Sequence, residues 1–421
     1  MSYALLTDRY ELTMVQAALQ SGKAKRDCVF EVFTRSLPAG RRYGVVAGTG
    51  RLLEAIRDFK FSADDIAYLQ EQSIVDVETL NYLIDYKFRG QIEGYQEGEL
   101  FFEGSPVLTV TASFAEAVIL ETLILSILNH DSAIASAAAR MDSVAQGRSL
   151  VEMGSRRTQE RSAVAAARAA YIAGFDATSN LQAGKQWGIP TMGTSAHSFT
   201  LLHDSEEEAF KAQVAALGVD TTLLVDTYDI KKAVDLAVKI TKGKVAAVRI
   251  DSGDLAATAE EVRKQLDRLG ATDTKIVLTS DLDEYTIAAL ASSPVDRFGV
   301  GTSLVTGSGH PTAGFVYKLV AHQKGHTWVD VAKKSKGKTS KGGKKIAYRQ
   351  LEDGFATAEL IGKKSGRKLQ QVLFDGAPEQ QYLGKAGVRL ARAHHQKARS
   401  ELLPNALRLS KGEPAIPTIY S

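Results

Sequence analysis

Short apolar segments alternate with longer amphipathic segments through the middle of the chain, from about residue 150 to residue 300. Each apolar segment is about four residues long, which is typical of a buried strand, and each amphipathic segment is long enough for a helix. Repeated alternation of this kind predicts parallel strands joined by crossover helices. The predicted strands are residues 150–153, 172–175, 189–192, 222–225, 245–248, 275–278 and 297–300, and the predicted helices include 205–217, 230–240, 256–269 and 284–291.

Small and chemically reactive residues follow nearly every predicted strand. In a (β/α) barrel all strand C-termini converge on one mouth, where the site is built. An open doubly wound sheet would use only the strand ends beside its switch point. The distribution therefore favours an α/β barrel whose site collects these pairs: Glu152 and Arg156, Ser179 and Asn180, Thr194 and His197, Asp226 and Asp229, Arg249 and Asp251, Ser280 and Asp281, and Gly301 and Thr302.

The alternation is absent on both sides of this region. Residues 1–112 mix a helical opening with strand-like pieces, and we predict that they form an N-terminal domain. A long helical segment from about residue 115 to 146 then opens a catalytic domain, predicted over 113–318. The remaining residues, 319–421, form a C-terminal region that begins near a Lys- and Gly-rich loop at 333–345.

Composition narrows the functional class. The chain has 421 residues, 44% hydrophobic and 24% charged, with a net charge of +3, which is ordinary for a globular protein and argues against a general nucleic-acid or membrane-surface role. Its single cysteine, Cys28, excludes an internal disulfide and indicates a reducing compartment. We expect no signal peptide, and the apolar region 106–128 contains Glu116 and Glu121, so we expect no membrane span and a cytoplasmic location.

Two groups of residues at the predicted barrel mouth suit anions. Arg249 alternates with apolar residues in a strand, where a guanidinium pointing into the mouth would form a fork for a carboxylate or phosphate; an ion-paired surface arginine is the alternative. Gly301 and Thr302 follow a late strand and could bring backbone N–H groups and a hydroxyl to a phosphate, although a simple tight turn fits equally well. The chain has no Walker motif and no Gly-x-Gly-x-x-Gly fingerprint.

Four carboxylates stand at neighbouring strand ends, where they could hold Mg²⁺ that in turn holds a diphosphate. Asp254 and Asp283 each precede a helix, so helix capping is an equal alternative for them. Asp251 and Asp281 are the better metal candidates. His197 could be hydrogen-bonded scaffold or could accept a phosphoryl group.

Taken together, these motifs resemble the nicotinate phosphoribosyltransferase family over nearly the whole chain. Many ordered motifs are far more specific than any one of them. The only departures are Arg9 and Met153, which stand where apolar or aromatic residues are expected. The matching segments are residues 7–14, 33–35, 40–43, 152–157, 178–180, 193–198, 225–229, 248–254, 279–281 and 298–302.

The resemblance implies a type II phosphoribosyltransferase. Such enzymes have an irregular α/β barrel and a second domain, mainly β and α+β, built from both chain ends, so residues 319–421 would pack on the N-terminal domain. They are homodimers with shared active sites. The implied roles are phosphorylation by ATP for His197, ring contact across the interface for Tyr10, nicotinate binding for Thr194 and Arg249, pocket lining for Arg156, ribose and ring contact for Asp251, and phosphoribosyl binding for Ser280, Asp281, Gly301 and Thr302.

The implied reaction joins nicotinate to phosphoribosyl diphosphate, giving nicotinate mononucleotide and diphosphate in NAD biosynthesis, with ATP as co-substrate, Mg²⁺ as cofactor and no tightly bound organic cofactor. The related nicotinamide enzyme places an Asp where this chain has Asn180 or its neighbour, so we predict nicotinate over nicotinamide. The alternatives are quinolinate or nicotinamide phosphoribosyltransferase, or a catalytically silent binding homologue. Segment 333–345 has no interleaved aromatics or arginines, which favours a solvated loop over a nucleic-acid contact.

Overall fold

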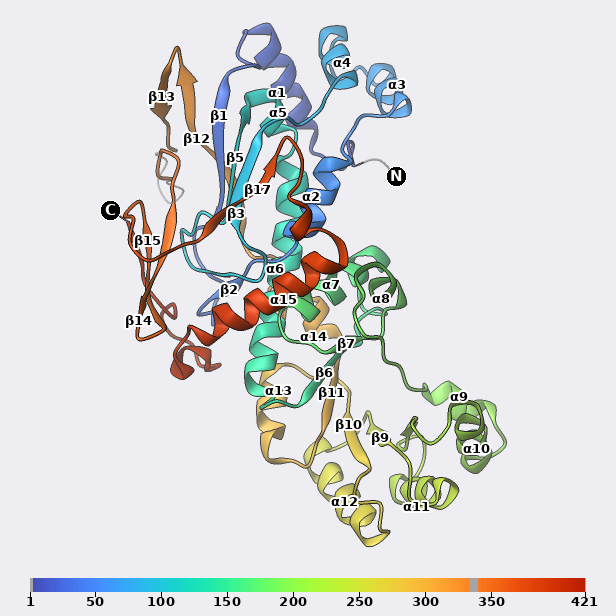
Figure 1. Cartoon of the computed structure of the whole chain (residues 1–421). Coiled ribbons are helices and arrows are strands. Elements are labelled where there is room, and N and C mark those ends of the chain that lie inside the picture. Colours follow the sequence, from blue (N-terminus) through green and yellow to red (C-terminus); the bar gives the residue numbers. More distant parts are fainter. Residues whose placement is uncertain (1–2, 334–339, 421) are drawn as a thin grey trace. The chain divides into compact units, whose positions relative to one another are not determined.

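The computed structural model describes residues 3–333 and 340–420 and divides the chain into two compact units (Figure 1). The central unit contains Ala137–Gly309, and the terminal unit contains the residues up to Ser136 together with those from His310 onward. Residues 334–339 of the predicted Lys-rich loop lie outside the described residues.

The central unit is built on a six-stranded parallel sheet. Its strand order is β7-β6-β11-β10-β9-β8, with β6 (Ser149–Glu152), β7 (Ala177–Thr178), β8 (Thr222–Leu224), β9 (Ala247–Ile250), β10 (Lys275–Leu278) and β11 (Arg297–Val300). Neighbouring strands in this sheet pair in parallel, as the alternating pattern predicts. Among the described residues no ladder joins β7 to β8, so the strands form an incomplete barrel.

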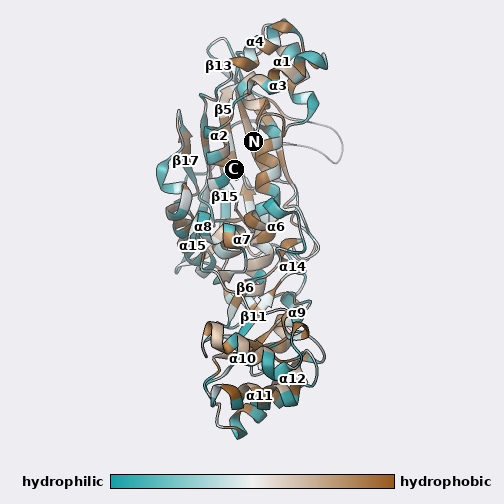
Figure 2. Cartoon of the chain, turned by 90° about the vertical axis from the view of Figure 1, so that its right-hand side faces the viewer, coloured by the Kyte–Doolittle hydropathy of each residue, from teal (hydrophilic) through white to brown (hydrophobic). Residues whose placement is uncertain are grey.

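Helices connect these strands. They are α7 (Glu160–Ile172), α8 (Leu181–Trp187), α9 (His197–Leu202), α10 (Glu206–Leu217), α11 (Ile230–Thr241), α12 (Leu255–Arg268), α13 (Glu284–Ala289), the 3-10 turn η1 (Leu290–Ser292) and α14 (Thr302–Val305). Figure 2 shows that α11 carries both hydrophobic and hydrophilic residues. Its buried side chains follow helical spacing: Ala233, Val234, Ala237, Val238 and Thr241. Burial of one apolar stripe explains why the helical period is visible in the sequence.

Two of the predicted strands are wrong. Residues 172–175 are the end of α7 and the turn after it, in which Gly174 has φ of 123°. Ile172 and Phe175 are fully buried there, so their apolar character reflects packing rather than extended backbone. Residues 189–192 contribute only one isolated bridge, Thr178 to Thr191. The other predicted strands overlap observed ones, because a short apolar segment between two helices is readily buried as a strand of the central sheet.

The terminal unit is built on sheets that combine both ends of the chain. A six-stranded sheet has the order β13-β12-β1-β5-β3-β17, with β1 (Asp27–Thr34), β3 (Gln91–Tyr95), β5 (Leu108–Ser113), β12 (Phe315–Lys324), β13 (Thr327–Asp330) and β17 (Gln370–Asp375). In Figure 1 the orange strand β12 lies beside the blue strand β1, and Cys28 pairs with His322 in this antiparallel ladder. The smaller sheets are β16-β14-β15-β18 and β2-β4, from β2 (Gly44–Val45), β4 (Leu100–Phe101), β14 (Ala347–Glu352), β15 (Phe355–Ile361), β16 (Arg367–Lys368) and β18 (Thr418–Tyr420).

Helices complete this unit. They are α1 (Arg9–Gln20), α2 (Thr49–Arg57), α3 (Ala63–Glu71), α4 (Val77–Ile84), α5 (Phe114–Val118), the first part of α6 (Glu121–Val144), α15 (Gly384–Ser400), and the 3-10 turns η2 (Gln380–Tyr382) and η3 (Pro404–Leu407). The C-terminal end of the Lys-rich loop is anchored: Lys345 donates from Nζ to buried Glu31 at 2.6 Å, and Lys344 pairs with Glu93.

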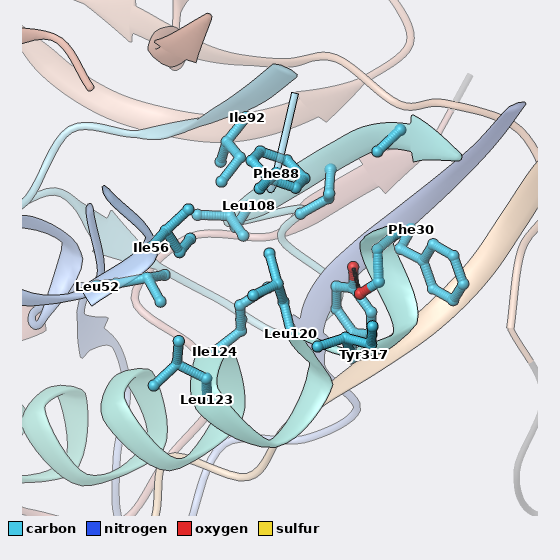
Figure 3. Packing of buried hydrophobic residues seen from close by; sticks show 14 of the residues in the cluster. Phe30, Leu52, Ile56, Phe88, Ile92, Leu108, Leu120, Leu123, Ile124 and Tyr317 are labelled. Carbon is cyan, nitrogen blue, oxygen red and sulfur yellow. Dashed lines mark hydrogen bonds between the residues drawn. The ribbon is translucent and has the colours of Figure 1, made fainter. Parts of the chain in front are cut away.

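The core of the terminal unit explains where the chain divides. Figure 3 shows Leu120, Leu123 and Ile124 packed among residues of the sheet, and the ring of Phe30 stacks on Tyr317 with centroids 4.7 Å apart. The division therefore falls inside α6, after Ser136, rather than at the predicted 112/113 boundary, and the second division falls before His310 rather than at 318/319. A continuous apolar helix does not reveal in sequence which core receives each half. The segment Phe114–Val144 is long and apolar enough to cross a membrane, but 67% of its most apolar window is buried inside the protein.

Candidate active site

A cavity of about 540 Å³ opens at the C-terminal ends of the central sheet. Because the strands are parallel, the residues that follow β6, β7, β9, β10 and β11 all reach this one edge. Residues 193–196, before α9, form another wall. The predicted site residues in its lining are Arg156, Thr194, Arg249, Asp251, Ser280, Asp281, Gly301 and Thr302, and the others are Met153, Ser155, Arg157, Ser179, Gly193, Ser195, Ala196, Thr279 and Gly299.

Arg249, on β9, organises one side of the cavity. Its Nε donates to Thr279 Oγ1 at 2.8 Å, and one terminal nitrogen donates to Thr194 Oγ1 at 2.9 Å and to the Ser195 carbonyl at 3.2 Å. The other terminal nitrogen pairs with Asp251 Oδ1 at 2.9 Å. The side chain is only 12% exposed, so these contacts hold the planar guanidinium in one orientation beside the cavity.

Asp251 is held as an anion. Burial raises the pKa of its carboxyl, but hydrogen bonds from Thr279 and Arg249 and the charge of Arg249 outweigh burial and keep the pKa below its ordinary value. A fixed negative charge therefore faces the cavity next to the fixed positive charge of Arg249.

Thr279 is a site residue that the sequence analysis missed. Its hydroxyl accepts from Arg249 and donates to Asp251, so it fixes the positions of both charges. The space beside it depends on Gly299: a Cβ at that position would lie 2.6 Å from Thr279 Cγ2 and 2.7 Å from Met153 Sδ. The sequence feature that could have indicated Thr279 is its position at the end of a predicted strand, directly before the predicted site residues Ser280 and Asp281.

His197 is the first residue of α9 and is not among the residues that line the cavity. Its Nε2 lies 3.2 Å from Oδ1 of Asp226, a side chain that is 1% exposed, whereas the His197 side chain is 40% exposed. The other oxygen of Asp226 accepts from the Asp251 backbone N–H at 2.9 Å and from the Ser252 hydroxyl at 2.6 Å. Sequence analysis placed Asp226 at a strand end but assigned it no role.

Two arginines and a strained turn also line the cavity. Arg156 and Arg157 are exposed, and their side chains make no hydrogen bond or ion pair with any described residue. Ser280 has φ of 103°, a region that residues other than glycine seldom adopt and that clusters at functional sites. The two guanidinium groups therefore add positive charge to the cavity without a protein partner among the described residues.

Two further predicted residues, like His197, are not in the lining of this cavity. Tyr10 belongs to the terminal unit, where α1 leaves it 45% exposed; burial, followed by the charges of Glu121, Glu11 and Asp8, raises the pKa of its hydroxyl to about 12. Asn180 caps α8 by accepting from Ala183 N at 2.9 Å and donates to Ser155 Oγ at 3.0 Å. Asn180 is therefore linked to the cavity by its hydrogen bond to Ser155, which is a lining residue.

The carboxylates divide into two kinds. Asp254 and Asp283 accept backbone N–H groups at the starts of α12 and α13, so for both of them the capping interpretation holds. In the described part of the chain no group of three or more His, Cys, Asp or Glu side chains could hold a metal ion. Asp281 is exposed and lines the cavity, and Asp251 is committed to Arg249 and Thr279. This arrangement fits Mg²⁺ carried mainly by a phosphate ligand rather than by a protein cage.

Comparison with known proteins shows the family to which the chain belongs. The model of the nicotinate phosphoribosyltransferase N-terminal domain matches residues 5–129, and the nicotinate phosphoribosyltransferase family model matches residues 148–360. The chain is 54% identical to nicotinate phosphoribosyltransferase pncB1 of Mycobacterium tuberculosis, over 98% of this chain and 94% of that protein. It is 38% identical to nicotinate phosphoribosyltransferase of Bacillus subtilis, over 83% and 73% of the two chains.

Solved structures agree on the fold. Human nicotinic acid phosphoribosyltransferase superposes with a TM-score of 0.84 at 25% identity, covering 99% of this chain and 97% of that one. Nicotinate-nucleotide pyrophosphorylase of Pyrococcus furiosus has the same fold, with a TM-score of 0.75 at 24% identity and 94% coverage of both chains. The fold class predicted from the resemblance is therefore confirmed.

Proposed function

The chain belongs to the nicotinate phosphoribosyltransferase family, and we propose that it transfers the phosphoribosyl group of phosphoribosyl diphosphate to nicotinate with the assistance of ATP. The products are nicotinate mononucleotide and diphosphate, which places the protein in NAD biosynthesis or salvage. The observation that carries this proposal is the cavity at the strand ends, which is lined both by the oriented pair Arg249 and Asp251 and by the side chains of Arg156 and Arg157.

The Arg249 side of the cavity suits the nicotinate carboxylate. A guanidinium already oriented by Thr194, Thr279 and Asp251 loses little freedom when it binds a planar carboxylate. The pyridine nitrogen carries a free lone pair, so the reaction needs no general base. As the new C–N bond forms, the bond from C1 of the ribose to the diphosphate oxygen breaks, and the Asp251 anion stabilises the positive charge that develops on the sugar.

The rest of the cavity suits the phosphoribosyl diphosphate. Arg156, Ser280, Asp281, Gly301 and Thr302 all line it. The cation and the hydroxyls can hold phosphate oxygens of the substrate. Mg²⁺, when bound, would neutralise charge on the diphosphate, and Asp281 and Asp251, which both line the cavity, are the carboxylates that would share that ion.

His197 is assigned the phosphoryl acceptor role. With Nε2 directed at Asp226, the neutral ring carries its proton on Nε2 and a lone pair on Nδ1, and no described residue hydrogen-bonds Nδ1. Nδ1 attacks the γ-phosphorus of ATP, the bond to the ADP oxygen breaks, and ADP leaves. Water later releases inorganic phosphate from the phosphohistidine.

Nicotinate is the proposed acceptor rather than nicotinamide. The end of β7 presents Ser179 and Asn180, neither of which is charged, so no carboxylate there repels the nicotinate anion.

We also propose that the enzyme is a cytoplasmic homodimer with shared sites, in which Tyr10 contacts the pyridine ring bound to the partner subunit. Its exposure in the terminal unit supports this, because it leaves the ring free to contact a ligand.

The experiment is product formation from nicotinate, phosphoribosyl diphosphate and Mg²⁺, with and without ATP. We expect nicotinate mononucleotide, increased by ATP, and little product from nicotinamide. Turnover of quinolinate without ATP would replace the proposal with the quinolinate reaction. Folded protein that makes no product under any of these conditions would indicate a binding homologue.

A further inference from the structure

The Asp226 carboxylate joins two parts of the site that are separate in sequence. Its Oδ1 lies 3.2 Å from His197 Nε2. Its Oδ2 accepts from the Ser252 hydroxyl at 2.6 Å and from the Asp251 backbone at 2.9 Å. One nearly inaccessible anion is therefore shared between the ring that ATP would phosphorylate and the turn that carries Asp251.

Phosphorylation changes what the His197 ring offers to this anion. If Nδ1 gains a phosphoryl group while Nε2 keeps its proton, the ring becomes imidazolium-like, and its N–H becomes a charge-assisted donor. Such donors bind carboxylates about twice as strongly as neutral ones. Asp226 is then held more strongly at Oδ1 by His197, so the lengths of the hydrogen bonds that Oδ2 accepts from Ser252 and Asp251 change. The most direct of these donors is Ser252, because its hydroxyl is free to rotate and makes the shorter bond.

We propose that Ser252 is a positioning residue that transmits the phosphorylation state of His197, through Asp226, to the turn bearing Asp251. The inference rests on the proposed function, since it concerns the ATP-dependent step of that reaction. It assigns a role to a side chain that lies outside the cavity lining. Asp251 is the group that responds, because its backbone N–H shares Oδ2 with Ser252 and its carboxylate lines the cavity.

The geometry allows a selective test. Ser252→Ala removes the hydroxyl donor and leaves the backbone donor of Asp251, the His197 contact and the Arg249 pair in place. Ser252 is exposed, so the substitution leaves no buried cavity. Ser252→Thr restores a hydroxyl, and Ser292→Ala, at an exposed serine in η1 that has no hydrogen bond to a described residue, is the matched control.

The experiment measures kcat and KM for phosphoribosyl diphosphate with and without ATP, and in parallel the acid-labile ³²P that the protein takes up from [γ-³²P]ATP. In Ser252→Ala we expect ³²P uptake to persist and the ATP-independent rate to stay within about twofold. The ATP-dependent gain in kcat/KM should fall by at least about fivefold, the lower end of ordinary coupling between sites. Ser252→Thr should restore the gain, and Ser292→Ala should not change it.

An undiminished ATP gain in Ser252→Ala overturns the inference and leaves the proposed function standing. Loss of ³²P uptake together with the gain would also overturn it, because Ser252 would then act on phosphorylation itself. If the unsubstituted protein makes nicotinate mononucleotide with no ATP gain, or makes none, the proposed function fails and this inference fails with it.

Discussion

His197 Nε2 and Asp226 Oδ1 lie 3.2 Å apart, although 29 positions separate the two residues in the chain. The carboxylate is almost completely inaccessible and the ring is partly exposed, so the pair has one fixed end and one end open to a ligand. A carboxylate on one ring nitrogen sets the tautomer and leaves the other nitrogen as the nucleophile. This geometry supports the proposed phosphoryl-acceptor role of His197, and it gives the first prediction.

His197→Ala should abolish acid-labile phosphorylation and the ATP-dependent gain while leaving some ATP-independent synthesis. Asp226→Asn should lower phosphorylation by at least about tenfold, because a neutral amide no longer selects the tautomer with Nδ1 unprotonated. Both are checked by ³²P uptake and by initial rates with and without ATP. ATP coupling that survives intact in His197→Ala would show that another group accepts the phosphoryl.

Arg249→Ala should damage nicotinate use more than stability. Loss of a charge-assisted carboxylate contact worth about 2–3 kcal/mol would reduce kcat/KM for nicotinate by about 30-fold to 150-fold. The free energy of unfolding should fall by only about 1–3 kcal/mol, because the Asp251 side chain is 29% exposed and can bond water in place of the arginine. Denaturant unfolding and steady-state kinetics measure the two effects, with exposed Arg268→Ala as the control. A collapsed fold with no specific kinetic defect would favour a structural arginine.

Removal of Arg156 or Arg157 should weaken phosphoribosyl diphosphate binding with little effect on stability, since neither side chain has a partner among the described residues. Each substitution by alanine should raise KM for phosphoribosyl diphosphate by about tenfold, the value of one charge-assisted bond to phosphate. The effect should shrink as salt is raised from 50 to 300 mM, because screening already weakens an exposed contact. A KM equal to that of the unsubstituted enzyme at both salt concentrations would exclude that arginine from the site.

Asn180→Asp tests the basis of substrate choice. Aspartate also caps helices, so α8 should remain intact, but a negative charge would now stand beside Ser155 at the cavity wall. We expect kcat/KM for nicotinate to fall by about tenfold, the effect of one nearby like charge. Asn180→Ser, which keeps a capping oxygen without charge, is the control. Equal nicotinate use by both variants would show that position 180 does not select the substrate.

The stability of the protein should depend on pH through Glu11. Burial raises the pKa of this carboxyl from 4.5 to about 7, although hydrogen bonds from Thr122 and Thr7 oppose the shift. Because the folded value lies above the unfolded one, the stabilising contribution is fully present below pH 4.5 and is lost as pH rises through 7. Glu11→Gln should therefore gain about 1–3 kcal/mol relative to the unsubstituted protein between pH 6 and pH 8.

Urea unfolding at several pH values measures that difference, and Glu78→Gln, on the exposed first turn of α4, serves as the control. The same pH dependence in Glu11→Gln and in the unsubstituted protein would locate the titrating group elsewhere.

The sequence by itself determined five of the six strands of the central sheet, all except β7, and the residues that follow them. Burial imposes a local period on strands and helices, and parallel connectivity brings all strand ends to one edge, so Arg249, Asp251, Ser280 and Thr302 could be assigned to one cavity. The family resemblance rested on the same local motifs, and the match to the family models confirms that resemblance.

Only the tertiary structure decided the contacts between those strand ends. Asp226 meets His197, and Thr279 meets Arg249, because neighbouring strands in space are distant in sequence, and no local pattern encodes which partner a polar side chain finds. For the same reason the sequence could not show that Asn180 caps a helix while its neighbour Ser179 lines the cavity. It also explains the division inside α6: each half of an apolar helix is equally compatible with either core until the chain has packed.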